Sequence, residues 1–170
     1  VRKGATDDVI EYSLSQLRPI LIRNARWKDV EAVYREFHES HPDHRLALEA
    51  INWIGKAIVR QAGTPEEREE ASARSRKFLA DTILEVIDDP QREGVEELLV
   101  ELARASRPKR RAAPPPPEGA DPSAVVAPPP VPTALEQGAE TEAEMDRLLT
   151  PESGEHSRVA QARIVYAKSL

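Results

Sequence analysis

The stretch from residue 42 to residue 62, PDHRLALEAINWIGKAIVRQA, is the most apolar long segment of the chain. At 3.6 residues per turn its apolar side chains cover more than half of a helix circumference, which leaves a narrow polar stripe through Glu49, Asn52, Lys56 and Arg60. A helix this apolar is stable only where neighbouring segments cover it. We therefore expect residues 42–62 to form the central helix of an all-α fold, with Pro42 in the first turn.

The segments before this stretch predict two more helices. Asp7 and Asp8 suit the first turn of a helix that we expect to end or kink near Arg18, because Pro19 has no backbone N–H to donate. Residues 27–39 place apolar side chains at three- and four-residue spacing and predict a second, amphipathic helix.

The segments after it predict two further helices. Thr64, Pro65 and Glu67 follow the order of a capping box, which predicts a helix over residues 65–88. Asp89 and Pro90 repeat the cap-then-proline pattern and predict a last core helix that ends near residue 106. The sequence thus predicts a small bundle of about five helices, over residues 6–106.

The remainder of the chain differs in composition. Ten of the 15 prolines lie between Pro108 and Pro132, so residues 107–133 read as a Pro/Ala-rich linker with a basic start. Residues 134–170 form an acidic segment with short helical patterns. We expect this tail to present a recognition helix at the end of a tether; the alternatives are that it folds back onto the bundle or is disordered. The candidate partner-binding residues on it are Val159, Ala162, Ile164, Val165, Tyr166 and Leu170.

Basic residues gather in two places, although the chain as a whole carries a net charge of −6. One set precedes the second helix and the other begins the linker, and either could contact phosphates. A solvated surface and helix C-terminal stabilisation are the alternatives. The candidate nucleic-acid residues are Arg18, Arg23, Arg26, Lys28, Arg107, Lys109, Arg110 and Arg111.

Three histidines, His38, His41 and His44, invite a metal hypothesis. The expected helix break at Pro42 separates their rings onto different elements, so we predict neither a metal nor a cofactor and keep the three only as candidates. The chain lacks cysteine, which excludes disulfides, thiol catalysis and Cys-ligated zinc.

No phosphate-binding glycine loop, nucleophile elbow or zinc-protease motif occurs, which weakens an enzymatic hypothesis without excluding it. No secretion signal or membrane-spanning run is apparent, so we expect a cytoplasmic protein without a membrane segment. The sequence favours a non-catalytic adaptor, assembly or regulatory protein that binds a protein partner and forms a homo-oligomer. The alternative is a nucleic-acid-binding accessory protein, such as a repressor or a phage DNA-packaging component.

Overall fold

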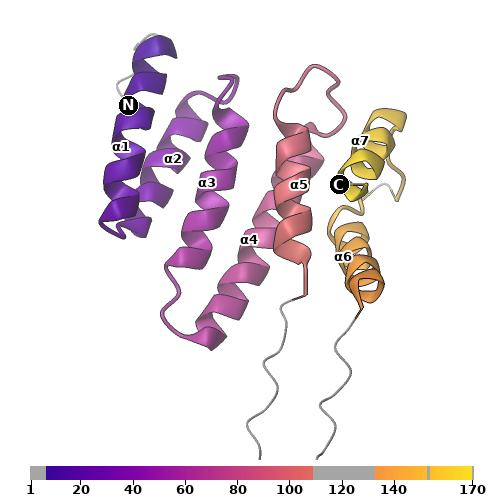
Figure 1. Cartoon of the computed structure of the whole chain (residues 1–170). Helices are drawn as coiled ribbons and strands as arrows, with labels where there is room; N and C mark the ends of the chain where they lie inside the picture. The colour runs from indigo at the N-terminus through magenta and orange to yellow at the C-terminus, as the bar shows by residue number, and fades with distance from the viewer. Residues whose placement is uncertain (1–6, 109–132, 153, 170) are drawn as a thin grey trace, which may run out of the picture.

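The computed structural model describes residues 7–108, 133–152 and 154–169 and shows an all-α fold (Figure 1). The described residues form seven helices and no strand, which confirms the predicted fold class. In chain order the helices are α1 (Asp7–Arg23), α2 (Trp27–Ser40), α3 (Ala47–Arg60), α4 (Pro65–Val86), α5 (Val95–Ser106), α6 (Ala134–Leu148) and α7 (Arg158–Lys168).

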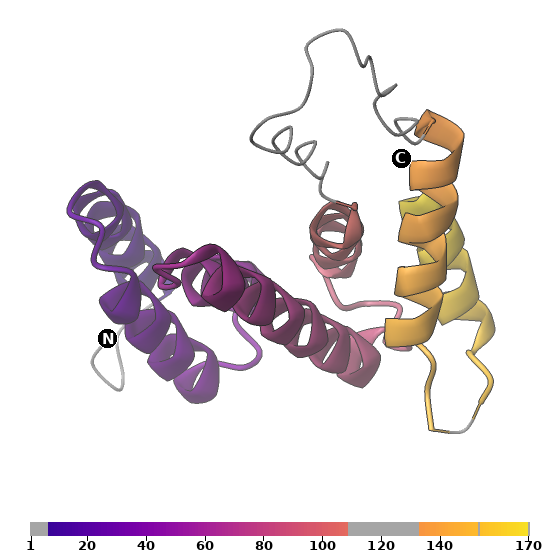
Figure 2. The same ribbon diagram turned by 90° about the horizontal axis from the view of Figure 1, so that it is seen from below.

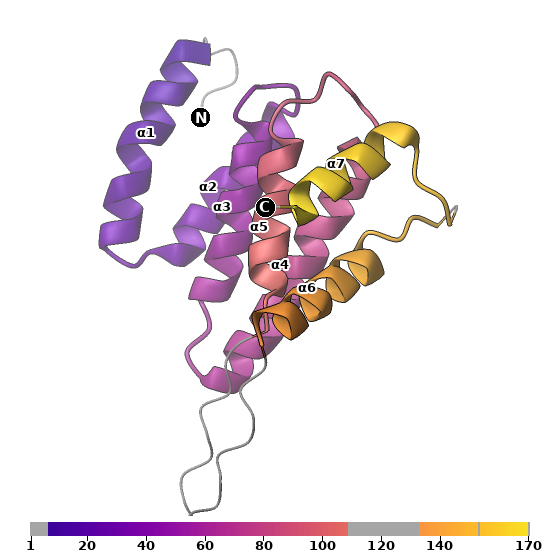
Figure 3. The same ribbon diagram turned by 45° about the vertical axis from the view of Figure 1, so that its right-hand side comes forward.

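Helices α1 to α5 follow one another across the molecule in chain order (Figures 1 and 2). Each packs chiefly against the next, and α3 also contacts α5. Helices α6 and α7 lie against the side of α5 that is farthest from α1 (Figure 3). The molecule is therefore an array in which α1 forms one end and the C-terminal helices cover the other.

Helix α3 is the central element that its apolar sequence predicts. Seven of its residues are buried against α2, α4 and α5, among them Leu48, Ile51 and Ile54. The approach of α4 is close because position 55 is glycine: the Ser75 hydroxyl donates to the Gly55 carbonyl at 2.9 Å. A Cβ on Gly55 would lie 3.0 Å from that hydroxyl oxygen, so a side chain there would push the two helices apart.

The predicted start of α3 is wrong by five residues. Residues 42–46 form turns, and the helix begins at Ala47. The reason is local hydrogen bonding: the His44 backbone N–H donates to His41 O, and the Leu46 N–H donates to His44 Nδ1 at 3.1 Å. Because the Leu46 N–H bonds to the His44 side chain, it does not donate to the Pro42 carbonyl as it would in a helix that began at Pro42.

Two further boundaries differ from the sequence-based expectation. Helix α1 continues through Pro19 to Arg23, which keeps Leu21 buried in the core at 4% exposure. Helix α5 starts after Gly94 rather than at the Asp88–Pro90 pattern. Gly94 has φ +88°, a left-handed conformation that suits glycine, and its backbone approaches Leu48 closely.

The capping box at the start of α4 is present as predicted. The Thr64 hydroxyl accepts from the Glu67 N–H, and the Glu67 carboxylate accepts from the Thr64 N–H. Backbone hydrogen bonds from Gly63 and Thr64 lower the pKa of Glu67. Thr133 and Glu136 form the same arrangement at the start of α6, where the sequence pattern had not led us to expect it.

The C-terminal helices belong to the same hydrophobic core as α1–α5. Met145 and Leu149 are each 1% exposed, and Ala160, Ile164 and Ala167 of α7 are also buried. The linker prediction falls mostly on residues 109–132, which lie outside the described residues. No helix among the described residues is both long and apolar enough to cross a membrane.

Candidate functional site

A polar cleft of about 410 Å³ separates α1 from α3. It exists because α1 packs on α2 through Ile10, Leu14 and Leu21 and stands away from α3. Side chains of α1, α2 and α3 and of the turn before α3 line the cleft: Asp8, Glu11, Tyr12, Leu14, Ser15, Arg18, Tyr34, Leu46 and Glu49. Three carboxylates and one guanidinium make this lining net acidic.

An ion pair between α1 and α3 crosses the cleft at one end. The Arg18 guanidinium donates to Glu49 Oε1 at 2.7 Å, and the Trp53 indole N–H donates to the same oxygen at 3.2 Å. The Arg18 guanidinium also lies 4.9 Å from the centre of the Trp53 ring. Arg18 therefore neutralises Glu49 and contacts an aromatic ring at the same time.

The same aromatic ring connects this ion pair to α5. Lys56 Nζ lies 5.1 Å from the Trp53 ring centre and 3.8 Å from Glu101 Oε2. Glu101 in turn pairs with Arg104 at 2.7 Å. Alternating charges thus run from α1 over α3 to α5, with half-buried Trp53 among them.

Tyr34 of α2 forms the base of the cleft. Its ring stacks on Trp53, with centroids 6.2 Å apart and planes 20° from parallel. The residue is 3% exposed, and its hydroxyl is buried without a hydrogen-bond partner of good geometry among the described residues. Tyr34 is one of the residues that line the cleft, and Arg18 lies beside its buried hydroxyl.

Burial raises the pKa of the Tyr34 phenol above its usual value of 10.0, while the positive charge of Arg18 acts in the opposite direction. Above about pH 10 the unfolded chain therefore loses this proton before the folded protein does. We expect the free energy of unfolding of wild type, measured relative to that of Tyr34→Phe, to fall as the pH rises from about 9 to about 11. Urea denaturation of both proteins over this range tests it, and a constant difference would contradict it.

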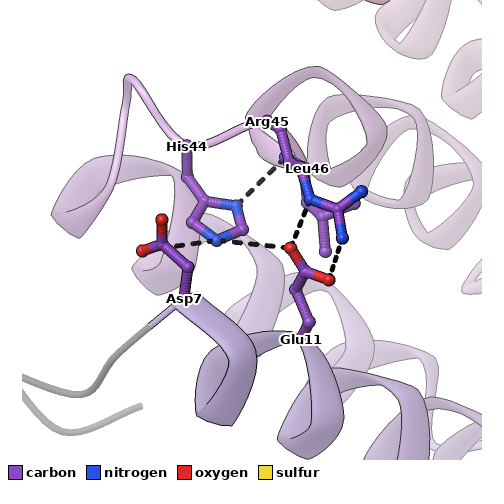
Figure 4. Close-up of polar contacts among 5 residues, drawn as sticks. All are labelled: Asp7, Glu11, His44, Arg45 and Leu46. Atoms are coloured by element: carbon purple, nitrogen blue, oxygen red, sulfur yellow. Dashed lines mark hydrogen bonds and ion pairs between the residues drawn. The ribbon is translucent and has the colours of Figure 1, made fainter.

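A second polar cluster joins the start of α1 to the turn before α3 (Figure 4). His44 Nδ1 accepts from the Leu46 N–H, so the neutral ring carries its proton on Nε2. That nitrogen lies 3.8 Å from Asp7 Oδ1 and 3.9 Å from Glu11 Oε1, beyond direct hydrogen bonding. The Arg45 guanidinium pairs with both oxygens of Glu11. These contacts hold Glu11 at the edge of the cleft.

The three candidate metal ligands are close in sequence but do not converge. His41 stacks on Phe37 with centroids 5.6 Å apart, and His44 meets the same ring edge-on at 5.3 Å. The buried Nδ1 atoms of His38 and His41 make no hydrogen bond to any residue that the structure describes. In the part of the chain that the structure describes, no three His, Asp or Glu side chains are placed to hold a metal ion.

The candidate nucleic-acid residues are dispersed. Arg18 faces the cleft, and Arg26 pairs with Asp29 at 2.6 Å, whereas Arg23 and Lys28 are exposed. Arg107 is exposed beside a second cleft, between α4, α5 and α6, and Lys109, Arg110 and Arg111 lie outside the described residues. The structure thus separates Arg18 from the other basic residues of its set.

The candidate partner-binding residues of the tail fall on different faces of α7. Ile164 is 7% exposed and packs into the core, while Val165 and Tyr166 are 67% and 53% exposed. Val159 is half-buried, Ala162 is exposed, and Leu170 lies outside the described residues. Of the arrangements that the sequence left open, the structure has the tail folded back onto the bundle.

Arg163, which no sequence pattern singled out, attaches α7 to the turn before α5. Its guanidinium pairs with Glu96 at 3.1 Å and donates to the carbonyl oxygens of Ile87 at 3.2 Å and of Pro90 at 3.4 Å. The side chain is only 10% exposed. The contact is therefore a largely buried, charge-assisted attachment rather than a surface ion pair.

Tyr34, Glu49 and Trp53 were not predicted as site residues from the sequence. One signal was available: Glu49 and Trp53 are four residues apart, at the border between the apolar face and the polar stripe of α3.

A scan against protein-family models, a search of curated proteins and a search of solved structures each give no match. Function must therefore be inferred from the geometry of the site.

Proposed function

We propose that this protein is a non-catalytic protein-interaction protein, of the adaptor, assembly or regulatory kind, that binds a peptide segment of a partner in the α1–α3 cleft. The observation that carries the proposal is the stacked Tyr34–Trp53 pair at an open cleft, with Arg18 beside the buried Tyr34 hydroxyl. Tyrosine, tryptophan and arginine dominate the energetics of protein interfaces, and here Arg18 joins the two aromatics.

The shape and chemistry of the cleft suit a peptide. It lies between two helices, with Leu14 and Leu46 as apolar lining and Tyr12, which is 67% exposed, at the rim. The net acidic lining complements a segment that carries lysine or arginine next to apolar side chains. None of the lining residues is a histidine, and the Ser15 hydroxyl donates to a backbone carbonyl, so the cleft offers no nucleophile–base pair.

The recognition-helix hypothesis assigns partner binding to α7 instead. In the folded-back arrangement its outward residues Val165 and Tyr166 remain accessible, whereas Ile164 does not. The two sites lie on different helices at opposite ends of the array (Figure 1). Variants of one site can therefore be tested without altering the other.

Two serines of α1 supply a matched pair of variants. Ser13 and Ser15 are both exposed, and each donates its hydroxyl to a backbone carbonyl of the same helix at 2.7 Å. Ser15 lines the cleft and Ser13 does not. Ser15→Arg places a bulky cation in the cleft, while Ser13→Arg makes the same change two residues away on another face.

The test begins with peptides selected from a random library on the wild-type protein. Their affinities are then measured by the fluorescence of Trp53 in a Trp27→Phe background, where it is the sole tryptophan. We expect selected peptides to contain lysine or arginine next to apolar residues. Ser15→Arg should weaken binding about tenfold or more, a loss of at least about 1.4 kcal/mol, and Ser13→Arg and Tyr166→Ala should leave it unchanged.

Four outcomes would overturn the proposal. Equal binding by both serine variants, or no selected peptide at all, would remove the cleft as the site. Loss of binding only in Val165 or Tyr166 variants would assign the function to α7. Retention on DNA that weakens steeply with salt and requires Arg23, Lys28 or the 107–111 tract would favour the nucleic-acid alternative.

A further inference from the structure

The outer face of α1 exposes an unusual share of apolar surface. Of the seven large hydrophobic side chains exposed among the described residues, four lie on this helix: Val9, Tyr12, Leu17 and Ile20. Val9 and Ile20 are 53% and 56% exposed. The terminal elements of helical arrays ordinarily present a polar outer face, which keeps the array soluble. Helix α1, at the end of this array (Figures 1 and 3), exposes Val9 and Ile20 among polar side chains such as Ser13 and Gln16.

Two of these four side chains, Val9 and Ile20, lie on one line along the helix, whereas Tyr12 lies at the rim of the cleft. Val9, Ser13, Gln16 and Ile20 follow one another at spacings of four, three and four residues, so they share one side of the helix. This side differs from the buried face through Ile10, Leu14 and Leu21 and from the cleft side. The Ser13 hydroxyl donates to the Val9 carbonyl at 2.7 Å and needs no outside partner when it is covered.

We propose that this face pairs with α1 of a second copy of the chain in antiparallel orientation, giving a two-fold symmetric dimer. With the helices centred on each other, Val9 lies opposite Ile20 of the second copy, and Ser13 lies opposite Gln16. The small Ser13 side chain allows the helices to approach closely at the centre. Each contact occurs twice, as a two-fold interface requires.

Charge complementarity identifies a second copy as the occupant. Asp8 and Arg23 flank the line on the same side of the helix, near opposite ends, and both are exposed. In the antiparallel pair, Asp8 of one copy lies beside Arg23 of the other, twice per dimer. A parallel pair would place like charges together instead. The antiparallel orientation also opposes the two helix dipoles favourably.

The proposed dimer does not depend on the peptide cleft. In its test, Ser13→Arg is the disrupting variant and Ser15→Arg is the control. Sedimentation equilibrium of the full chain should show a monomer–dimer equilibrium. A single helix pair is smaller than the interface of about 1,200 Å² or more of stable complexes, so micromolar or weaker association is expected. Ser13→Arg should weaken the dimer about tenfold or more, and Ser15→Arg should not.

A charge exchange tests the orientation. Asp8→Arg alone and Arg23→Asp alone each create two like-charge contacts across the interface, and each should weaken the dimer. The double variant, Asp8→Arg with Arg23→Asp, restores opposite charges and should recover the wild-type association constant. Circular dichroism checks that every variant keeps the helical fold.

A wild-type chain that stays monomeric at millimolar concentration would overturn the proposal, as would a dimer that tolerates Ser13→Arg. Failure of the double variant to recover association would overturn the antiparallel arrangement. Co-sedimentation of the monomer with anionic phospholipid vesicles, lost in Ser13→Asp, would assign the face to a lipid surface instead.

Discussion

Phe37→Ala is expected to lower the free energy of unfolding by about 3–5 kcal/mol, the usual cost of truncating a buried aromatic ring. Phe37 is fully buried, and the rings of His41 and His44 pack on it. Truncation leaves a cavity and also removes the support of the turn that positions His44 beside Glu11. Urea denaturation followed by circular dichroism measures the loss.

The matched control is Tyr166→Ala, which removes an aromatic ring of similar size that is 53% exposed. Its cost should stay within about 0.5 kcal/mol. A loss below about 1 kcal/mol for Phe37→Ala, well under the range for buried aromatics, would show that the turn between α2 and α3 is not organised around this ring.

Met145→Ala is expected to cost about 2–5 kcal/mol. Met145 is 1% exposed and belongs to the same hydrophobic cluster as Leu98, Leu99 and Leu102 of α5. The substitution should weaken the attachment of α6, so amide hydrogen exchange should accelerate in α6 and on the α5 side that it covers. Helices α1 and α2, at the far end of the array, should show the smallest change.

Leu135→Ala is the control in the same helix, because Leu135 is 84% exposed. It should alter stability by no more than about 0.5 kcal/mol. A tail that acts as an independent tethered segment predicts a different result: Met145→Ala and Leu135→Ala would both leave the stability of α1–α5 unchanged. The comparison therefore tests whether the C-terminal helices contribute to the core in solution.

The elements that the sequence predicted best are those with strong local signals. The capping box at Thr64 and Glu67 involves four consecutive residues, and α2 follows from a regular apolar spacing within 14 residues. The boundaries that were wrong depend on distant contacts. Helix α1 passes through Pro19 with Leu21 buried in the core, and α5 begins after Gly94, where Leu48 of α3 lies close.

The candidate site was less accessible to sequence reasoning than the fold. Arg18 and Glu49 are 31 residues apart, and nothing in either local segment indicates that they meet. From the sequence alone, Arg18 was interpreted as part of a basic patch, and Glu49 as one residue of the polar stripe on α3. Tyr34 has the spacing of a core residue, and only its contacts with Arg18 and Trp53 at the cleft indicate another role.

By itself, the sequence determined an all-α fold around a highly apolar helix. The signals for this fold, apolar spacing and helix caps, involve residues that are only a few helical turns apart. Only the tertiary structure decided that the tail packs on α5 and that Arg18, Tyr34, Glu49 and Trp53 meet at one cleft. These features depend on contacts between residues far apart in the chain, whose positions follow from how the helices pack.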